Sequence, residues 1–104
     1  MTALVVMTTL PDSPSAVKLA EILLDAHAAA CVHILPAGQS VYRWKGQVEH
    51  ATECTLLIKS TEAVYPLMER VILENHPYDL PEIIALPAVR GLEGYLGWIA
   101  SETA

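Results

Sequence analysis

Residues 41–60, VYRWKGQVEHATECTLLIKS, decide the fold. Two runs rich in β-branched and aromatic residues flank Lys45-Gly46, a pair that predicts a tight two-residue hairpin turn. With this turn Trp44 lies opposite Gln47, and directly opposed residues point to the same face of a sheet. One face is then predicted to carry Tyr42, Trp44, Glu49, Ala51, Glu53, Leu57 and Lys59, and the other Val48, Thr52, Cys54, Leu56 and Ile58. We expect helices to cover the second set.

The flanking sequence predicts a strand-helix-strand-strand-helix-strand order followed by a helix. Strands are expected over residues 3–9, 31–44, 47–60 and 82–86, with a break in the second at Pro36-Ala37-Gly38 because proline cannot donate to a ladder. Helices are expected from Ser13, as the N-cap, to about residue 29, and over 61–75 and 92–102. This order predicts a single ferredoxin-like α+β domain over residues 1–104, with a four-stranded antiparallel sheet, two helices on one face and a C-terminal helix.

The composition suggests that the other face is buried by further copies of the chain. Hydrophobic residues make up 53% of the sequence and charged residues only 17%, whereas an average globular protein has about 25% charged residues. A strand over residues 31–44 would extend about 45 Å, although a domain of this length has a radius of gyration of only about 13 Å. The hairpin is therefore expected to overhang its own core and to pair with neighbours. Alternatively, Pro36 and Gly38 shorten the strands and the aromatic residues pack locally.

Charge and hydropathy exclude several classes of partner. The net charge is −6 with six scattered Lys and Arg residues, which gives no basic stripe for nucleic acid. No apolar run approaches the roughly 20 residues that span a bilayer. Residues 1–10 lack the pattern of a signal peptide, so we expect a cytoplasmic protein with Cys31 and Cys54 as free thiols.

Several motifs resemble the CutA divalent-cation tolerance family. They are VYRWKG (41–46), LLIKS (56–60), HPYDLPEIIALP (76–87), YLGWI (95–99) and AACV (29–32), which together cover most of the chain in order. The resemblance implies a ferredoxin-like homotrimer with sheets inside, similar in architecture to PII signalling proteins. It also implies a link to tolerance of copper and other divalent metals, with no securely assigned reaction. Thr8 and Asn75 stand where some bacterial members carry a cysteine and a second histidine, and His33 stands where asparagine is common.

The candidate metal ligands are soft or imidazole groups, which suit copper. Cys31 and His76 are the pair we predict, and His33, Cys54 and Met7 are further candidates. No metal-binding spacing such as Cys-x-x-Cys occurs, and free cysteines often serve as small core residues. We therefore expect weak binding of copper or another divalent cation.

An inter-subunit pocket is the second candidate site. The residues assigned to it are Tyr42, Trp44, Glu53, Lys59, His76, Tyr78, Glu82 and Trp98. Lys59 and Glu53 either pair with each other or with neighbouring groups as structural glue, or they line a cleft that binds a small anion or effector.

No catalytic motif is evident, since the sequence has neither a nucleophile elbow nor a glycine-rich phosphate loop, and we predict that the protein is not an enzyme. The functional hypotheses are a trimeric metal-tolerance protein, a PII-like effector sensor and a ligand-free scaffold.

Overall fold

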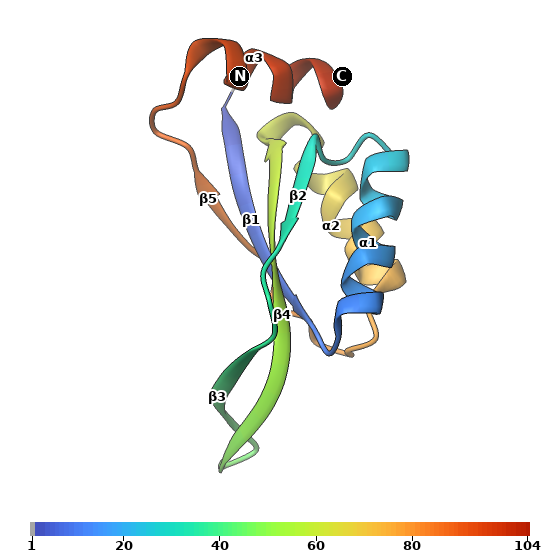
Figure 1. Cartoon of the computed structure of the whole chain (residues 1–104), viewed down its shortest axis with the longest axis vertical. Helices are drawn as coiled ribbons and strands as arrows, with labels where there is room; N and C mark the ends of the chain where they lie inside the picture. Colours follow the sequence, from blue (N-terminus) through green and yellow to red (C-terminus); the bar gives the residue numbers. More distant parts are fainter. Residues whose placement is uncertain (1) are drawn as a thin grey trace.

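The computed structural model describes residues 2–104 and has the predicted order of elements (Figure 1). The elements are β1 (Ala3–Leu10), α1 (Ser13–Asp25), β2 (Cys31–Ile34), β3 (Gly38–Trp44), β4 (Gln47–Thr61), the short 3-10 helix η1 (Glu62–Val64), α2 (Tyr65–Asn75), β5 (Ile84–Pro87) and α3 (Glu93–Glu102). The α+β class with a C-terminal helix is confirmed.

The sheet is antiparallel with the order β2-β4-β1-β5, and β3 pairs with the far half of β4. Strands β2 and β3 are two segments of the predicted long strand, separated at Pro36 as expected. The predicted hairpin register is also confirmed, because Trp44 pairs with Gln47 and Gly38 with Glu53. The turn residues Lys45 and Gly46 have φ of 49° and 80°, which fits a two-residue turn that needs positive φ at both positions.

Helices α1 and α2 cover one face of the sheet (Figure 1). The core between them is fully buried and is built from Val6, Leu19, Leu23, Leu56, Ile58, Met68 and Ile72. Helix α3 lies across the end of the sheet, where Ile99 packs with Ala3 and Ala30. Helices α1 and α2 are each held to the sheet by an apolar stripe, and burial of such side chains stabilises a fold by about 1.5–3 kcal/mol each.

Two predictions about α1 were wrong. Its N-cap is Asp12 rather than Ser13, since Asp12 Oδ1 accepts the Ser15 N–H at 2.8 Å. The helix ends at Asp25 and not near residue 29, and His27 has φ of 56°. The alanine-rich sequence after Asp25 favours helix, but the chain must turn there to reach β2, where the Ala30 N–H donates to the Lys59 carbonyl.

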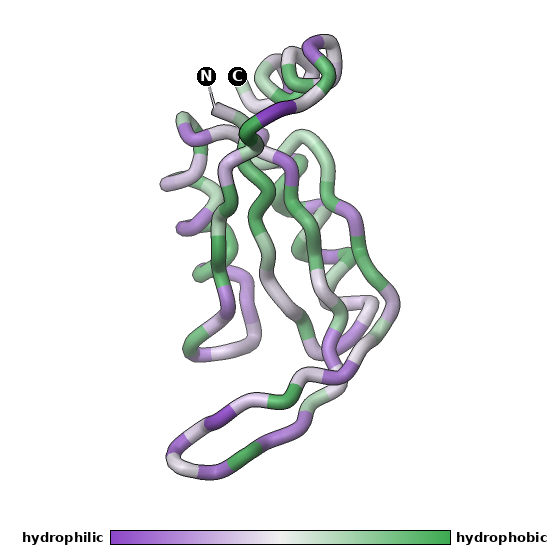
Figure 2. Tube along the Cα trace, turned by 90° about the vertical axis from the view of Figure 1, so that its left-hand side faces the viewer, coloured by the Kyte–Doolittle hydropathy of each residue, from purple (hydrophilic) through white to green (hydrophobic). Residues whose placement is uncertain are grey.

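The β3–β4 hairpin projects beyond both helices (Figures 1 and 2). Its outer part was predicted to be helix-covered at Val48 and Thr52, and this was wrong: both are exposed, and Val48 is 58% exposed. The helices do cover Cys54, Leu56 and Ile58, as predicted. The overhang makes the chain 44 Å long. The solvent-accessible surface of the chain is 6450 Å², whereas a compact monomer of this mass is expected to expose about 5,700 Å².

Candidate functional site

The face of the sheet opposite α1 and α2 carries rows of mainly apolar side chains, interrupted by His33 and Lys59, that no element of residues 2–104 covers. One row runs across four strands through His33, Leu57, Met7 and Ile84, and the next through Cys31, Lys59, Val5 and Leu86. Ile84 and Leu86 are 49% and 48% exposed. The same face continues onto the hairpin as Tyr42 and Trp44, which are 45% and 47% exposed. An apolar patch of this extent is typical of an interaction surface.

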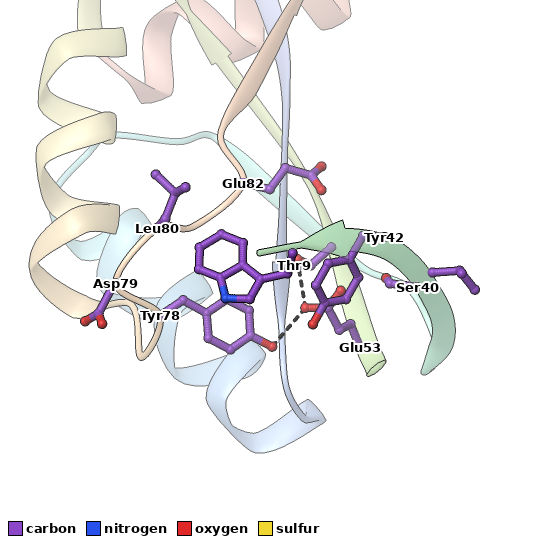
Figure 3. Close-up of a pocket in the computed structure, with 10 residues that line it drawn as sticks. Thr9, Ser40, Tyr42, Glu53, Tyr78, Asp79, Leu80 and Glu82 are labelled. Carbon is purple, nitrogen blue, oxygen red and sulfur yellow. Dashed lines mark hydrogen bonds between the residues drawn. The ribbon is translucent and has the colours of Figure 1, made fainter. Parts of the chain in front are cut away.

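A cavity of about 710 Å³ lies where the hairpin leaves the sheet (Figure 3). Its walls come from the hairpin, the end of β1 and the loop between α2 and β5. The lining residues are Thr9, Ser40, Val41, Tyr42, Trp44, Glu53, Tyr78, Asp79, Leu80 and Glu82. Its volume is in the range of small-molecule sites, which is about 300–1,000 Å³.

The carboxylate of Glu53 holds the three walls together. It accepts a hydrogen bond from the Tyr78 hydroxyl at 2.8 Å and from the Thr9 hydroxyl at 3.3 Å (Figure 3). Burial and the hydrogen bond to Glu53 raise the pKa of Tyr78 to about 12. Burial, and then the nearby Glu53 charge, raise the pKa of Glu82. The cavity is negatively charged, because its lining residues include the carboxylates of Glu53, Asp79 and Glu82 and no Lys, Arg or His.

His76 lies behind the cavity and orients Tyr78. Its Nε2 donates to the Thr9 carbonyl at 2.8 Å, and its Nδ1 accepts the Tyr78 N–H at 3.1 Å. The carbonyl can only accept and the N–H can only donate, so this arrangement requires the neutral imidazole. Burial also lowers the pKa of His76. Both ring nitrogens are engaged, and neither is free to bind a metal ion.

The structure brings together five of the eight residues assigned to the predicted pocket. Tyr42, Trp44, Glu53, Tyr78 and Glu82 all line the cavity, and His76 lies behind it.

Lys59 and Trp98 lie elsewhere. Lys59 is six residues from Glu53 along β4, or about 20 Å, so the two do not pair with each other. Trp98 is on α3 at the far end of the sheet, with its ring 5.6 Å from that of Tyr95.

Sequence reasoning missed Thr9, Ser40, Val41, Asp79 and Leu80 as lining residues. For Asp79 and Leu80 a signal was available, because both are part of the HPYDLPE motif. Thr9 had none, because only the pairing of β1 with β4 places its hydroxyl near Glu53.

The residues predicted to hold a metal ion are not brought together. Cys31 lies opposite Lys59 of β4, whereas His76 contacts Thr9, which lies opposite Thr55 of β4. Lys59 and Thr55 are four residues apart along the strand, or about 13 Å. Cys54 is buried in the core. Within residues 2–104 no group of three or more His, Cys, Asp and Glu side chains has the geometry to hold a metal ion. Cys31 and His76 of one chain therefore do not form a shared metal site.

None of the helices in residues 2–104 is both long enough and apolar enough to cross a bilayer.

Comparison with known proteins identifies the family. Residues 4–102 match the family described as CutA1 divalent ion tolerance protein. The chain is 39% identical over 99 residues to a divalent-cation tolerance protein CutA of Thermus thermophilus, covering 95% of this chain and 96% of that protein. It is 38% identical over 101 residues to the chloroplastic protein CutA of Arabidopsis thaliana, covering 97% of this chain and 56% of that one.

The crystal structure of CutA1 from Oryza sativa superposes with a TM-score of 0.96 at 36% identity, covering 100% of this chain and 95% of that chain. The bacterial relatives are named for divalent-cation tolerance, and not for a reaction. The chain belongs to the CutA1 divalent ion tolerance family.

Proposed function

We propose that the protein acts as a homotrimer with its three open sheet faces turned toward one another. The observation that supports this most directly is the uncovered apolar face, which runs from Leu86 and Ile84 to Tyr42 and Trp44. Side chains of this size are costly to leave in water, at about 25 cal/mol per Å². A second and third copy would cover them.

The projecting hairpin gives each copy a means of reaching its neighbour. Within residues 2–104, β3 pairs only with β4, and β5 pairs only with β1, so each leaves one edge unpaired. Unpaired edges invite pairing with another chain. Sedimentation equilibrium is expected to give three times the mass of the chain at micromolar concentration. A well-folded monomer with Trp44 in contact with water would refute the proposal.

We propose further that the trimer binds divalent cations such as copper only weakly, through exposed imidazole and carboxylate groups. His50 is exposed and lies on the side of the hairpin opposite Tyr42 and Trp44, so it stays accessible in the trimer. Imidazole binds copper(II) and zinc(II) well. Support comes from the separation of Cys31 from His76 and from the engaged ring of His76. The role in divalent-cation tolerance would then depend on something other than a tight metal site.

A second candidate function is that of an effector sensor. The cavity of about 710 Å³ favours it, because the cavity is bounded by the hairpin that would reach the neighbouring copy. A ligand in the cavity would then contact the part of the chain on which assembly depends. Thermal stabilisation of the trimer by a small molecule would support this function. A ligand-free scaffold remains the interpretation if metals and small molecules both fail to bind.

A further inference from the structure

We propose that the cavity between the hairpin and the loop after α2 binds an organic cation, through an ammonium or guanidinium group. The inference depends on the proposed trimer at one point, because a neighbouring copy would close the open side of the cavity. The cavity itself is formed within one chain.

The first argument is charge. Three carboxylates line the cavity, from Glu53, Asp79 and Glu82, and no basic residue does. Glu53 already accepts two hydrogen bonds, whereas Glu82 makes none with residues 2–104. Several carboxylates that line one cavity with no basic residue among them favour a positively charged ligand. A small anion, which the sequence suggested, would be repelled.

The second argument is the aromatic lining. Tyr42, Trp44 and Tyr78 contribute rings to the same cavity, and the faces of such rings attract cations. Lys45 of this chain shows the effect, since its ammonium lies 5.9 Å from the centroid of the Trp44 ring. The combination of aromatic rings and carboxylates is typical of sites for quaternary ammonium and guanidinium groups.

The third argument separates an organic cation from a metal ion. A hard divalent cation requires about six to eight oxygen ligands for calcium, or a near-ideal octahedron for magnesium. Residues 2–104 offer no three-ligand group, and the cavity of about 710 Å³ far exceeds the space that a single ion fills. A larger, weakly hydrated cation matches both its size and its lining.

The test uses the intrinsic fluorescence of Trp44. The chain has two tryptophans, so a Trp98→Phe background leaves Trp44 as the only reporter. Choline and agmatine are titrated as the ammonium and guanidinium probes, and 3,3-dimethylbutanol serves as the uncharged isostere of choline. We expect a saturable change with at least one cation and at least a tenfold weaker response to the isostere.

Charge variants locate the site. Glu82→Gln is expected to weaken cation binding about two- to fivefold, in line with loss of one solvent-exposed ion pair. Glu74→Gln is the matched control, because Glu74 is exposed on α2 and does not line the cavity. Lys45→Met is expected to strengthen binding, since it removes the competing ammonium from the Trp44 ring.

Three results would overturn the inference: no saturable change with either cation, equal binding of the isostere, or equal effects of Glu82→Gln and Glu74→Gln. Sedimentation of the same samples separates this failure from failure of the proposed function. A trimer that does not bind cations contradicts only the inference. A monomer that binds cations in a Glu82-dependent way contradicts only the assembly.

Discussion

Replacing Trp44 by alanine is expected to dissociate the trimer without unfolding the chain. Trp44 is 47% exposed in the single chain. A tryptophan buries up to about 250 Å², so assembly would remove about 110–120 Å² of this side chain from water in each copy. At about 25 cal/mol per Å², and allowing for the area that alanine still buries, the loss is about 2–3 kcal/mol per chain and about 6–9 kcal/mol per trimer.

Such a loss translates into a large change in concentration dependence. Each 1.4 kcal/mol is about tenfold in an equilibrium constant, and the midpoint of a monomer–trimer equilibrium varies as the square root of that constant. The concentration at which half the chains are assembled should therefore rise about 10²- to 10³-fold. Sedimentation velocity over a dilution series measures this midpoint.

The control variant is Leu73→Ala, which removes a residue of similar exposure, 55%, from the outer surface of α2. It should leave the midpoint unchanged. Far-ultraviolet circular dichroism should show the same helix content in both variants, because Trp44 lies outside the core cluster. A Trp44→Ala protein that stays trimeric across the whole dilution series would refute the assignment of this face to the interface.

Four further predictions follow from single sites. Tyr78 should titrate near its pKa of about 12, so its contribution to stability is complete below pH 10 and is lost as the pH rises from 10 to 12. Glu53→Gln should lower the pKa of Tyr78 only part of the way, because burial remains. Tyrosinate absorbance, compared with that of Tyr78→Phe, measures this pKa. Burial lowers the pKa of His76 from 6.5, so its contribution to stability is complete above pH 6.5 and declines as the pH falls below 6.5 toward the folded-state pKa. The thermal midpoint measured against pH should show this slope, and His76→Gln should flatten it. An NMR pKa of His76 at or above 6.5 would contradict the prediction. Gly46→Ala should cost about 1–2 kcal/mol in chemical denaturation, because Gly46 has φ of 80° and a side chain is disfavoured in that region; an unchanged midpoint would show that the hairpin turn does not contribute to global stability. Cys31→Ser should not change the weak affinity for copper(II) measured by calorimetry. A tight stoichiometric copper site that is lost on this substitution would show that Cys31 is a metal ligand, contrary to its separation from His76.

The sequence was informative where local rules determine the structure. The Lys45-Gly46 turn and the two-residue period of a strand determine which residues share a face, and the structure has the register that they predict. Pro36 marks the break between β2 and β3 for the simple reason that it has no N–H. These features depend on neighbouring residues only.

The errors arose where the structure depends on how far one element extends over another. Val48 lies on the helix side of the sheet, yet it is exposed because α1 and α2 end before the hairpin does. Glu53 and Lys59 share a face, but their spacing along β4 places them far apart. The engagement of both ring nitrogens of His76 also needed the structure, since its partner Thr9 is 67 residues away in sequence.

The hairpin links the two proposals, because Trp44 belongs both to the cavity and to the face assigned to assembly. A ligand that binds the trimer more tightly than the monomer through Trp44 must stabilise the trimer. By linkage, assembly must then raise the affinity for the ligand by the same factor by which the ligand favours assembly. Glu82 lines the cavity but contributes no large apolar surface to the open face. Glu82→Gln should therefore weaken cation binding with little effect on the trimer measured without ligand, whereas Trp44→Ala should weaken both. If the two variants affected assembly equally, the cavity and the interface would have to be a single surface, and the ligand would compete with the neighbouring copy instead of reinforcing it.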